Sequence, residues 1–274
     1  MINLLKIEWL KVKNYTAFKV MGIFFIVGIL LANYVVYMFN KNVIQESGGS
    51  MILGSFQPYS FESTWQTTSY TSGFLLLLPA MLLIMLLTNE FAFRTNRQNV
   101  IDGWSRHEFI SVKLVMALLI AVSSTILVVV TALGFGLGSK TTFSLIGFSH
   151  IGYFFLKALT YNFFAVLISI LVKKTGFAIG LCFIYIGAEN IISQLLDFAS
   201  LKLKAQSDLD LGAIGDYLPI NAADGLLTFP ENNLKSIAKA ALPADYTWVV
   251  FGFALAYLVL FVWWSRKKFL RADL

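Results

Sequence analysis

The side chains of this sequence that could do chemistry fall into two small groups. The first group interrupts long apolar runs, where a charge at the centre of a bilayer costs about 2.5–3.5 kcal/mol unless it is paired or hydrated. Lys157 and Asn162 lie in one run, and Glu189 and Asn190 lie in another. Two interpretations stay open: these residues form a hydrophilic substrate path or conformational lock, or Lys157 and Glu189 make a structural contact or snorkel to the outer interface.

The second group is the charged segment from Glu90 to Lys113, which separates two apolar runs. Arginine guanidinium groups offer planar forks of donors to the carboxylates or carbonyls of a protein partner. We therefore predict a helix with a polar face toward a cytosolic partner and an apolar face anchored by Phe93 and Trp104. A solvated loop lying on lipid headgroups is the alternative. On a helix, Phe93, Val100, Ile101 and Trp104 would share one stripe, and Arg94, Gln98, Asp102 and Ser105 another.

Other catalytic signatures are weak. His107 has no second histidine four residues on and His150 stands alone, so nearby residues assemble no zinc site. A glycine-rich run ends in Ser139 and Lys140, but a phosphate-binding loop needs glycine before its lysine. We instead predict close helix packing through Gly134 and Gly138 in a small-xxx-small pattern. We expect no catalytic residue, metal or cofactor in this chain.

The composition indicates which kind of element must position these residues. The 274 residues are 58% hydrophobic and only 13% charged, against about 25% charged in soluble domains. Apolar runs of the roughly 20 residues that cross a bilayer recur six times and are apolar on every face, which favours helices over a barrel. We predict an all-α membrane protein with a single transmembrane domain over residues 1–274. The expected spans are 20–39, 72–89, 114–138, 148–172, 177–196 and 247–265.

The distribution of lysine and arginine predicts the orientation. With both termini on one side, the segments on that side hold 14 of these residues in 56 positions, and the opposite segments hold 6 in 91. Cytoplasmic loops carry the excess of positive charge, so we expect both termini in the cytoplasm. The net charge of +6 is scattered among apolar runs and does not indicate nucleic-acid binding.

The composition of the segments outside the spans also predicts their local structure. An amphipathic helix is expected at the N-terminus, with Trp9 and Val12 on its apolar face and Lys6 and Lys13 opposite. Residues 40–71 are rich in Ser, Thr and aromatic residues and suit a short cap near the outer interface. The large outer loop, 197–246, mixes helical patterns such as 234–242 with prolines, which predicts broken helices that dip toward the membrane.

The segment after the second span resembles a known family. Glu90 closes that span, and Arg94-Thr95, an Arg97-Gln98-Asn99 run and Ser105-Arg106 follow before Lys113. This block is similar to the corresponding segment of type 2 ATP-binding-cassette (ABC) exporter permeases, and six spans with cytoplasmic termini agree over the whole chain. The sequence Tyr217-Leu-Pro219-Ile-Asn221 in the outer loop also looks like a feature of that family.

The resemblance implies a transport subunit of the bacterial plasma (inner) membrane. Two copies, or this chain and a related one, would form the substrate path, and a separate cytosolic ABC ATPase dimer would supply energy with its own ATP and magnesium. Export, or extraction of an amphiphile from the bilayer, is the implied activity. The segment after the second span would be the coupling helix that docks into the ATPase. Its expected coupling residues are Glu90, Phe93, Arg94, Thr95, Arg97, Asp102, Trp104 and Arg106.

Two other classes of function stay open at this point. An intramembrane enzyme acting on lipid or peptide could use Glu189 as acid or base, but it would need a nucleophile, and the sequence identifies none. A non-transporting scaffold for membrane assembly is compatible with every residue. The transported substrate and the choice between homodimer and heterodimer also stay open.

Overall fold

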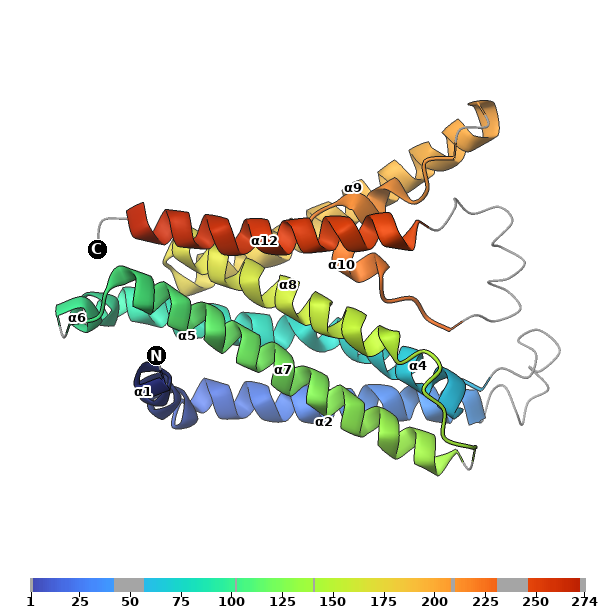
Figure 1. Ribbon diagram of the computed structural model, residues 1–274, viewed down its shortest axis with the longest axis horizontal. Helices are drawn as coiled ribbons and strands as arrows, with labels where there is room; N and C mark the ends of the chain where they lie inside the picture. The colour runs from blue at the N-terminus through green and yellow to red at the C-terminus, as the bar shows by residue number, and fades with distance from the viewer. Residues whose placement is uncertain are drawn as a thin grey trace.

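The computed structural model describes residues 2–41, 57–101, 103–139, 141–207, 210–230 and 246–271, and within these ranges the chain forms helices and no strand. Figure 1 shows long helices running side by side along one axis. The prediction of an all-α membrane protein with six spanning helices is confirmed at this level. The helices long and apolar enough to cross a membrane are Thr16–Phe39, Phe61–Ala92, Arg106–Gly138, Ser149–Val172, Thr175–Gln206 and Thr247–Arg271.

The spans and the short elements that precede and connect them follow one another along the chain in this order. The first half of the described chain forms α1 (Ile2–Lys13), α2 (Thr16–Phe39), α4 (Phe61–Gly73), η2 (Phe74–Leu76), α5 (Leu77–Ala92), α6 (Thr95–Ile101) and α7 (Arg106–Gly138). The second half forms α8 (Ser149–Val172), α9 (Thr175–Ser207), η3 (Ile214–Tyr217), α10 (Asn221–Gly225) and α12 (Thr247–Arg271).

Both described chain ends lie at the same end of the bundle. In Figure 1, α1, α6 and the C-terminal end of α12 are all at the left, and the start of α4 is at the right. We call these the α6 end and the far end. An even number of spans returns the chain to the side where it began, so this arrangement agrees with the predicted topology. That the α6 end faces the cytoplasm stays a prediction.

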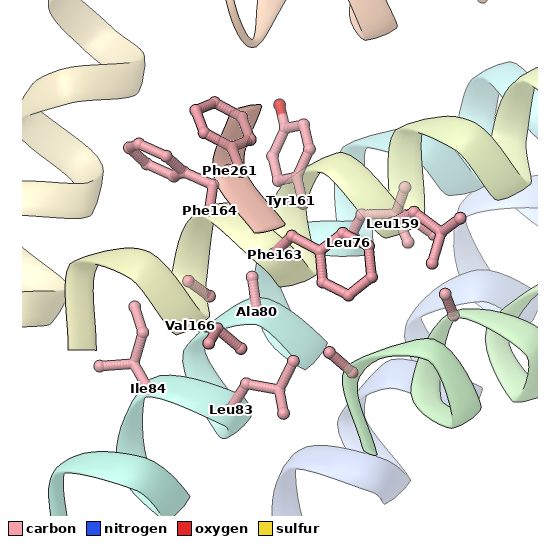
Figure 2. Packing of buried hydrophobic residues seen from close by; sticks show 14 of the residues in the cluster. Leu76, Ala80, Leu83, Ile84, Leu159, Tyr161, Phe163, Phe164, Val166 and Phe261 are labelled. Atoms are coloured by element: carbon pink, nitrogen blue, oxygen red, sulfur yellow. The ribbon is translucent and has the colours of Figure 1, made fainter. Parts of the chain in front are cut away.

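Helix α8 forms the centre of the bundle and is buried over most of its length. In Figure 2, Phe163 and Val166 point from α8 toward α5, while Phe164 points the other way, toward Phe261 of α12. The ring centroids of Phe164 and Phe261 are 5.5 Å apart. Lipid tails are as apolar as these side chains, so close packing rather than removal from water holds such helices together. The central position of α8 therefore fixes the neighbouring spans.

The second span begins earlier than the sequence predicted. The expected boundary was residue 72, with a cap before it, but helix α4 starts at Phe61 and is packed inside the bundle. Two of its hydroxyl groups have partners on other helices: Thr64 Oγ1 donates to the Ala132 carbonyl (3.3 Å) and Ser72 Oγ accepts from Asn33 Nδ2 (3.2 Å). The buried hydroxyls of Thr68 and Ser69 have no hydrogen-bond partner among the described residues. The burial of α4 was not predicted because its composition is polar.

One further boundary differs from expectation at the far end. Helix α9 continues to Ser207, eleven residues beyond the predicted 196. Residues 210–230 do contain two short helical elements, η3 and α10, and Leu226 and Ala222 pack with Leu156 of α8 and Val250 of α12. That this segment dips toward the membrane stays a prediction. The helical pattern expected over 234–242 lies outside the described residues.

The predicted glycine contacts were placed on the wrong face of α7. A Cβ atom at Gly134 or Gly138 would meet nothing within 4 Å, whereas one at Gly136 would lie 2.7 Å from Cε1 of Phe61. Helix α4 crosses α7 at Gly136, and the burial of α4 was not expected from its composition. Gly136 is therefore the position where α7 needs glycine for close packing.

Cysteine labelling should place the two ends of the bundle on opposite sides of the membrane. Thr142 at the far end and Gln98 at the α6 end are both exposed, and the native Cys182 is buried. In intact cells, an impermeant thiol reagent should label Thr142→Cys, and it should label Gln98→Cys only after permeabilisation. The unsubstituted chain is the control for background from Cys182. The reverse pattern would overturn the predicted orientation.

Candidate functional site

The segment between the second and third spans is a short helix between two sharp breaks, rather than one continuous helix. Helix α5 ends at Ala92, and Arg94 adopts a left-handed conformation with φ of 56°. Helix α6 then has only seven residues, and Gly103 follows with φ of 99°. Ser105 begins α7 with a capping box, because its hydroxyl accepts from the Glu108 amide while the Glu108 carboxylate accepts from the Ser105 amide.

These breaks overturn part of the predicted amphipathic pattern. Phe93 was expected to anchor the helix, but its side chain is 76% exposed, and Ile101 is 82% exposed. Asn96 and Asn99 are buried instead. The prediction assumed uninterrupted helical spacing, and the turn at Arg94 changes which residues face the bundle. Trp104 does pack against the core, with Lys11 Nζ 5.7 Å from its ring centroid.

The predicted coupling residues therefore separate into exposed and engaged side chains. Arg94 and Arg97 are exposed. Arg106 Nη1 instead donates to the Leu270 carbonyl (3.3 Å), which links the start of α7 to the end of α12. Thr95 Oγ1 lies 3.4 Å from the Glu90 carbonyl. Asp102 lies outside the described residues.

Glu90 belongs to a buried ionic cluster that we call the α1 clamp, formed by Glu8, Lys11, Glu90 and Lys113. Lys113 Nζ is 2.7 Å from Glu90 Oε1 and also donates to Glu8. Lys11 Nζ is 2.9 Å from Glu8 Oε1 and 3.5 Å from Glu90 Oε1. The side chain of Lys113 is 2% exposed. The clamp joins α1, the end of α5 and the first turns of α7, and so holds both helices that flank α6.

Two members of the clamp, Glu8 and Lys11, are held in their charged forms by their partners. Burial alone would raise the pKa of the Glu8 carboxyl, but the charge and hydrogen bonds of Lys113 and Lys11 outweigh burial and lower that pKa. Burial would likewise lower the pKa of Lys11, but Glu90 and Glu8 outweigh it and raise that pKa. Sequence reasoning missed the partnership because Glu8 and Lys113 are far apart in the chain. The available signals were an acid within a basic amphipathic helix and a lysine at the start of a span.

The intramembrane residues Lys157 and Glu189 do not pair with each other, so the predicted contact between them is wrong. Lys157 Nζ is 3.2 Å from Asp224 Oδ1, and Tyr161 donates to Asp224 Oδ2 (3.0 Å). Glu189 Oε1 accepts the backbone amides of Ile220 (2.6 Å) and Asn221 (2.8 Å). Their partners come from the outer loop, whose packing onto the spans was expected only in outline.

These contacts form a second cluster, which we call the far-end latch: Lys157, Tyr161, Glu189, Asn221 and Asp224. It fastens the segment around α10 to α8 and α9. Tyr257 of α12 adds a hydrogen bond from its hydroxyl to the Tyr217 carbonyl (3.0 Å). The segment 217–221, noted in the sequence, therefore supplies the backbone groups that the spans bind.

The other two intramembrane candidates lie apart from the latch. Asn162 is buried, and its Nδ2 donates to the Ala117 carbonyl (3.0 Å), which links α8 to α7. Asn190 is exposed on α9, and its Nδ2 donates to the Ile186 carbonyl of the same helix (2.9 Å). The four predicted residues thus do not converge on one site.

Substitution of Glu189 should separate a structural role from a proton-transfer role. Glu189→Gln keeps one acceptor oxygen but loses the charge-assisted bonds, so we expect a loss of about 1–2 kcal/mol in the free energy of unfolding. Glu189→Ala leaves two buried amides unpaired and should cost more. Asn190→Ala, at the exposed neighbouring position, should be nearly neutral. Denaturant titration of the purified chain measures all three, and equal costs for Gln and Ala would contradict this assignment.

Neither cluster has the composition of a metal site. Across the described ranges, no three His, Cys, Asp or Glu side chains gather closely enough to hold a metal ion. A comparison with models of known protein families found no match, and a comparison with curated proteins found none either.

Proposed function

We propose that this chain is the transmembrane subunit of an ABC transporter, an exporter of the bacterial plasma membrane, coupled to a separate cytosolic ATPase through α6. The coupling surface comprises the exposed residues Phe93, Arg94, Arg97 and Ile101. Binding and hydrolysis of ATP, with magnesium, belong to the partner. No residue of this chain is a chemical catalyst in this proposal.

The observation that carries the proposal is the exposure of large apolar side chains beside arginines on α6 and on the turn that precedes it. A helix lying on its own bundle would bury Phe93 and Ile101, but both are more than three-quarters exposed. Aromatic and arginine side chains supply much of the binding energy at protein interfaces, and guanidinium forks select carboxylates and carbonyls. This composition supports docking to another protein at the α6 end.

The α1 clamp would transmit a movement of α6 to the helices that the clamp joins. Helix α6 is joined by two-residue and four-residue connections to α5 and α7, whose adjoining ends are held together by Lys113 and Glu90. When the ATPase dimer closes, a displacement of α6 would reach both spans and α1 together. A ligand shifts a conformational equilibrium only through different affinities for the two states, so the ATPase would need to bind the closed arrangement more tightly.

The substrate path is proposed to form between two permease chains. Helices α2, α9 and α12 are mostly uncovered by the rest of this chain. In the most apolar 18-residue stretch of each helix, only 17% is buried. Asn190 places an exposed polar group on such a face of α9. Lipid can cover an apolar face, whereas a polar group at membrane depth favours a water-filled path or a second copy.

The geometry does not favour the enzyme alternative. Glu189 Oε1 accepts two backbone amides and so holds the outer segment, while its buried Oε2 has no hydrogen-bond partner among the described residues. A general acid or base must reach a substrate proton at about 2.6–3.2 Å. A non-transporting scaffold would have no ATPase partner, and this difference separates it from the proposed transporter.

The test is purification of the tagged full chain from its native membrane, followed by reconstitution in liposomes. We expect a nucleotide-binding subunit with Walker motifs to co-purify and to hydrolyse ATP at a rate that depends on this chain. A chain purified free of that subunit should not hydrolyse ATP. A preparation without such a subunit would contradict the proposal. ATP hydrolysis by the isolated chain would contradict the assignment of ATPase activity to the partner.

A further inference from the structure

The orientation of α12 about its own axis is fixed near the α6 end by three inward residues. Phe261, Ser265 and Phe269, spaced four residues apart, are buried. Phe269 stacks on Phe109 of α7 with ring centroids 4.9 Å apart and planes within 9°. Positions 263, 267 and 271 fall on the opposite side of a helix with 3.6 residues per turn. The last two turns of α12 must therefore present those side chains away from the bundle.

The outward side of α12 carries tryptophan and positive charge around one hollow. Trp263 is 56% exposed and Trp264 is 44% exposed. Lys267 Nζ lies 4.3 Å from the centroid of the Trp263 ring, within the range of a cation–π interaction. The hollow has a volume of about 260 Å³ and is lined by Trp263, Trp264, Lys267, Lys268 and Arg271.

Nearby basic residues on the inward side are already engaged, which distinguishes them from this group. Arg266 Nη2 is 3.0 Å from Ser111 Oγ, and Arg106 binds the Leu270 carbonyl. Among the described residues, Lys267, Lys268 and Arg271 have no acidic partner within 4 Å. Three positive charges thus gather around one hollow without a described counter-charge.

We propose that this hollow binds the phosphate of an anionic phospholipid headgroup. Tryptophan is enriched where a span meets the headgroups, because its ring is apolar and its N–H is polar. The two tryptophans precede the basic residues along α12, so the hollow lies where the hydrocarbon ends and the phosphates begin. An acidic protein surface would satisfy the charges but would not need exposed tryptophans at this depth. The proposal is independent of the transporter assignment.

The test uses the full chain in nanodiscs of phosphatidylcholine with a minor fraction of phosphatidylglycerol. Native mass spectrometry after release should find phosphatidylglycerol retained on the wild-type chain above its bulk fraction. Each basic residue near an anionic surface contributes roughly a fivefold factor, so Lys267→Gln/Lys268→Gln/Arg271→Gln should reduce the enrichment by about tenfold or more. Trp263→Ala should reduce it without any change in net charge.

A matched control removes three positive charges elsewhere at the same end. Lys6→Gln/Lys13→Gln/Lys174→Gln alters exposed residues outside the hollow and should keep the enrichment. Inorganic phosphate at millimolar concentration should not displace the lipid, because the acyl chains hold the headgroup at this depth. Equal loss in the control triple would overturn the proposed site in favour of general attraction. Displacement by inorganic phosphate would contradict lipid as the occupant.

Discussion

Replacing Arg94 and Arg97 together with alanine should lower the affinity of the chain for its ATPase by about thirtyfold or more. Both side chains are exposed beside Phe93 and Ile101 on the surface proposed to dock. Removing one partner of a desolvated charged contact typically costs about 2–5 kcal/mol, and 2 kcal/mol corresponds to about thirtyfold in the dissociation constant. Binding of the purified ATPase to the reconstituted variant measures the change.

Two control variants test whether the loss of affinity is specific to these two arginines. Lys6→Ala/Lys174→Ala removes the same charge from exposed positions at the same end and should bind the ATPase normally. Arg97→Lys keeps the charge but loses the planar fork, so it should give an intermediate affinity. If the double arginine variant binds the ATPase and transports as the wild type does, α6 is not the docking surface and is only a segment that lies on lipid headgroups.

The second large effect is expected from Lys113→Met. Loss of this lysine leaves Glu8 and Glu90 close together in a buried site without their main counter-charge. Breaking a buried ion pair by removing one partner costs about 3–5 kcal/mol, so the variant should lose about that much in the free energy of unfolding. Denaturant titration of the purified chain in detergent measures it.

The matched variants separate charge from side-chain volume. Lys19→Met replaces an exposed lysine at the start of α2 and should be nearly neutral. Glu8→Gln/Glu90→Gln/Lys113→Met removes the three buried charges of the clamp and leaves only Lys11, whose side chain is 37% exposed. It should recover much of the loss, since replacing a buried ionic group is often neutral. If the triple variant is as unstable as Lys113→Met, the clamp stabilises by packing and its charges are incidental.

The sequence predicted the spans well where apolar character and helix coincide. The six spans follow from runs long enough to cross a bilayer. Helix α4 was missed because Thr64 and Ser72 satisfy their hydroxyls through contacts with α7 and α2. Such partners come from other helices and leave no local trace in the sequence.

The candidate sites were predicted in composition but not in pairing. Lys157 and Glu189 were recognised as costly intramembrane groups, yet their partners come from residues 220–224, whose folding onto the bundle depends on tertiary contacts. A helix was predicted between the second and third spans, but Phe93 was placed on the wrong side because a single left-handed residue, Arg94, interrupts the helical spacing. Helical periodicity cannot reveal such a break when the residue is not glycine.

Photo-cross-linking from position 93 tests the central claim most directly. A photoreactive phenylalanine analogue at Phe93 keeps the aromatic ring in the exposed position, and the same analogue at Phe143, also exposed but at the far end, is the matched control. After irradiation of native membranes, the account predicts an adduct between position 93 and a subunit that carries Walker motifs, and none from position 143. Adducts from position 93 with lipid alone, or an ATPase adduct only from position 143, would contradict it.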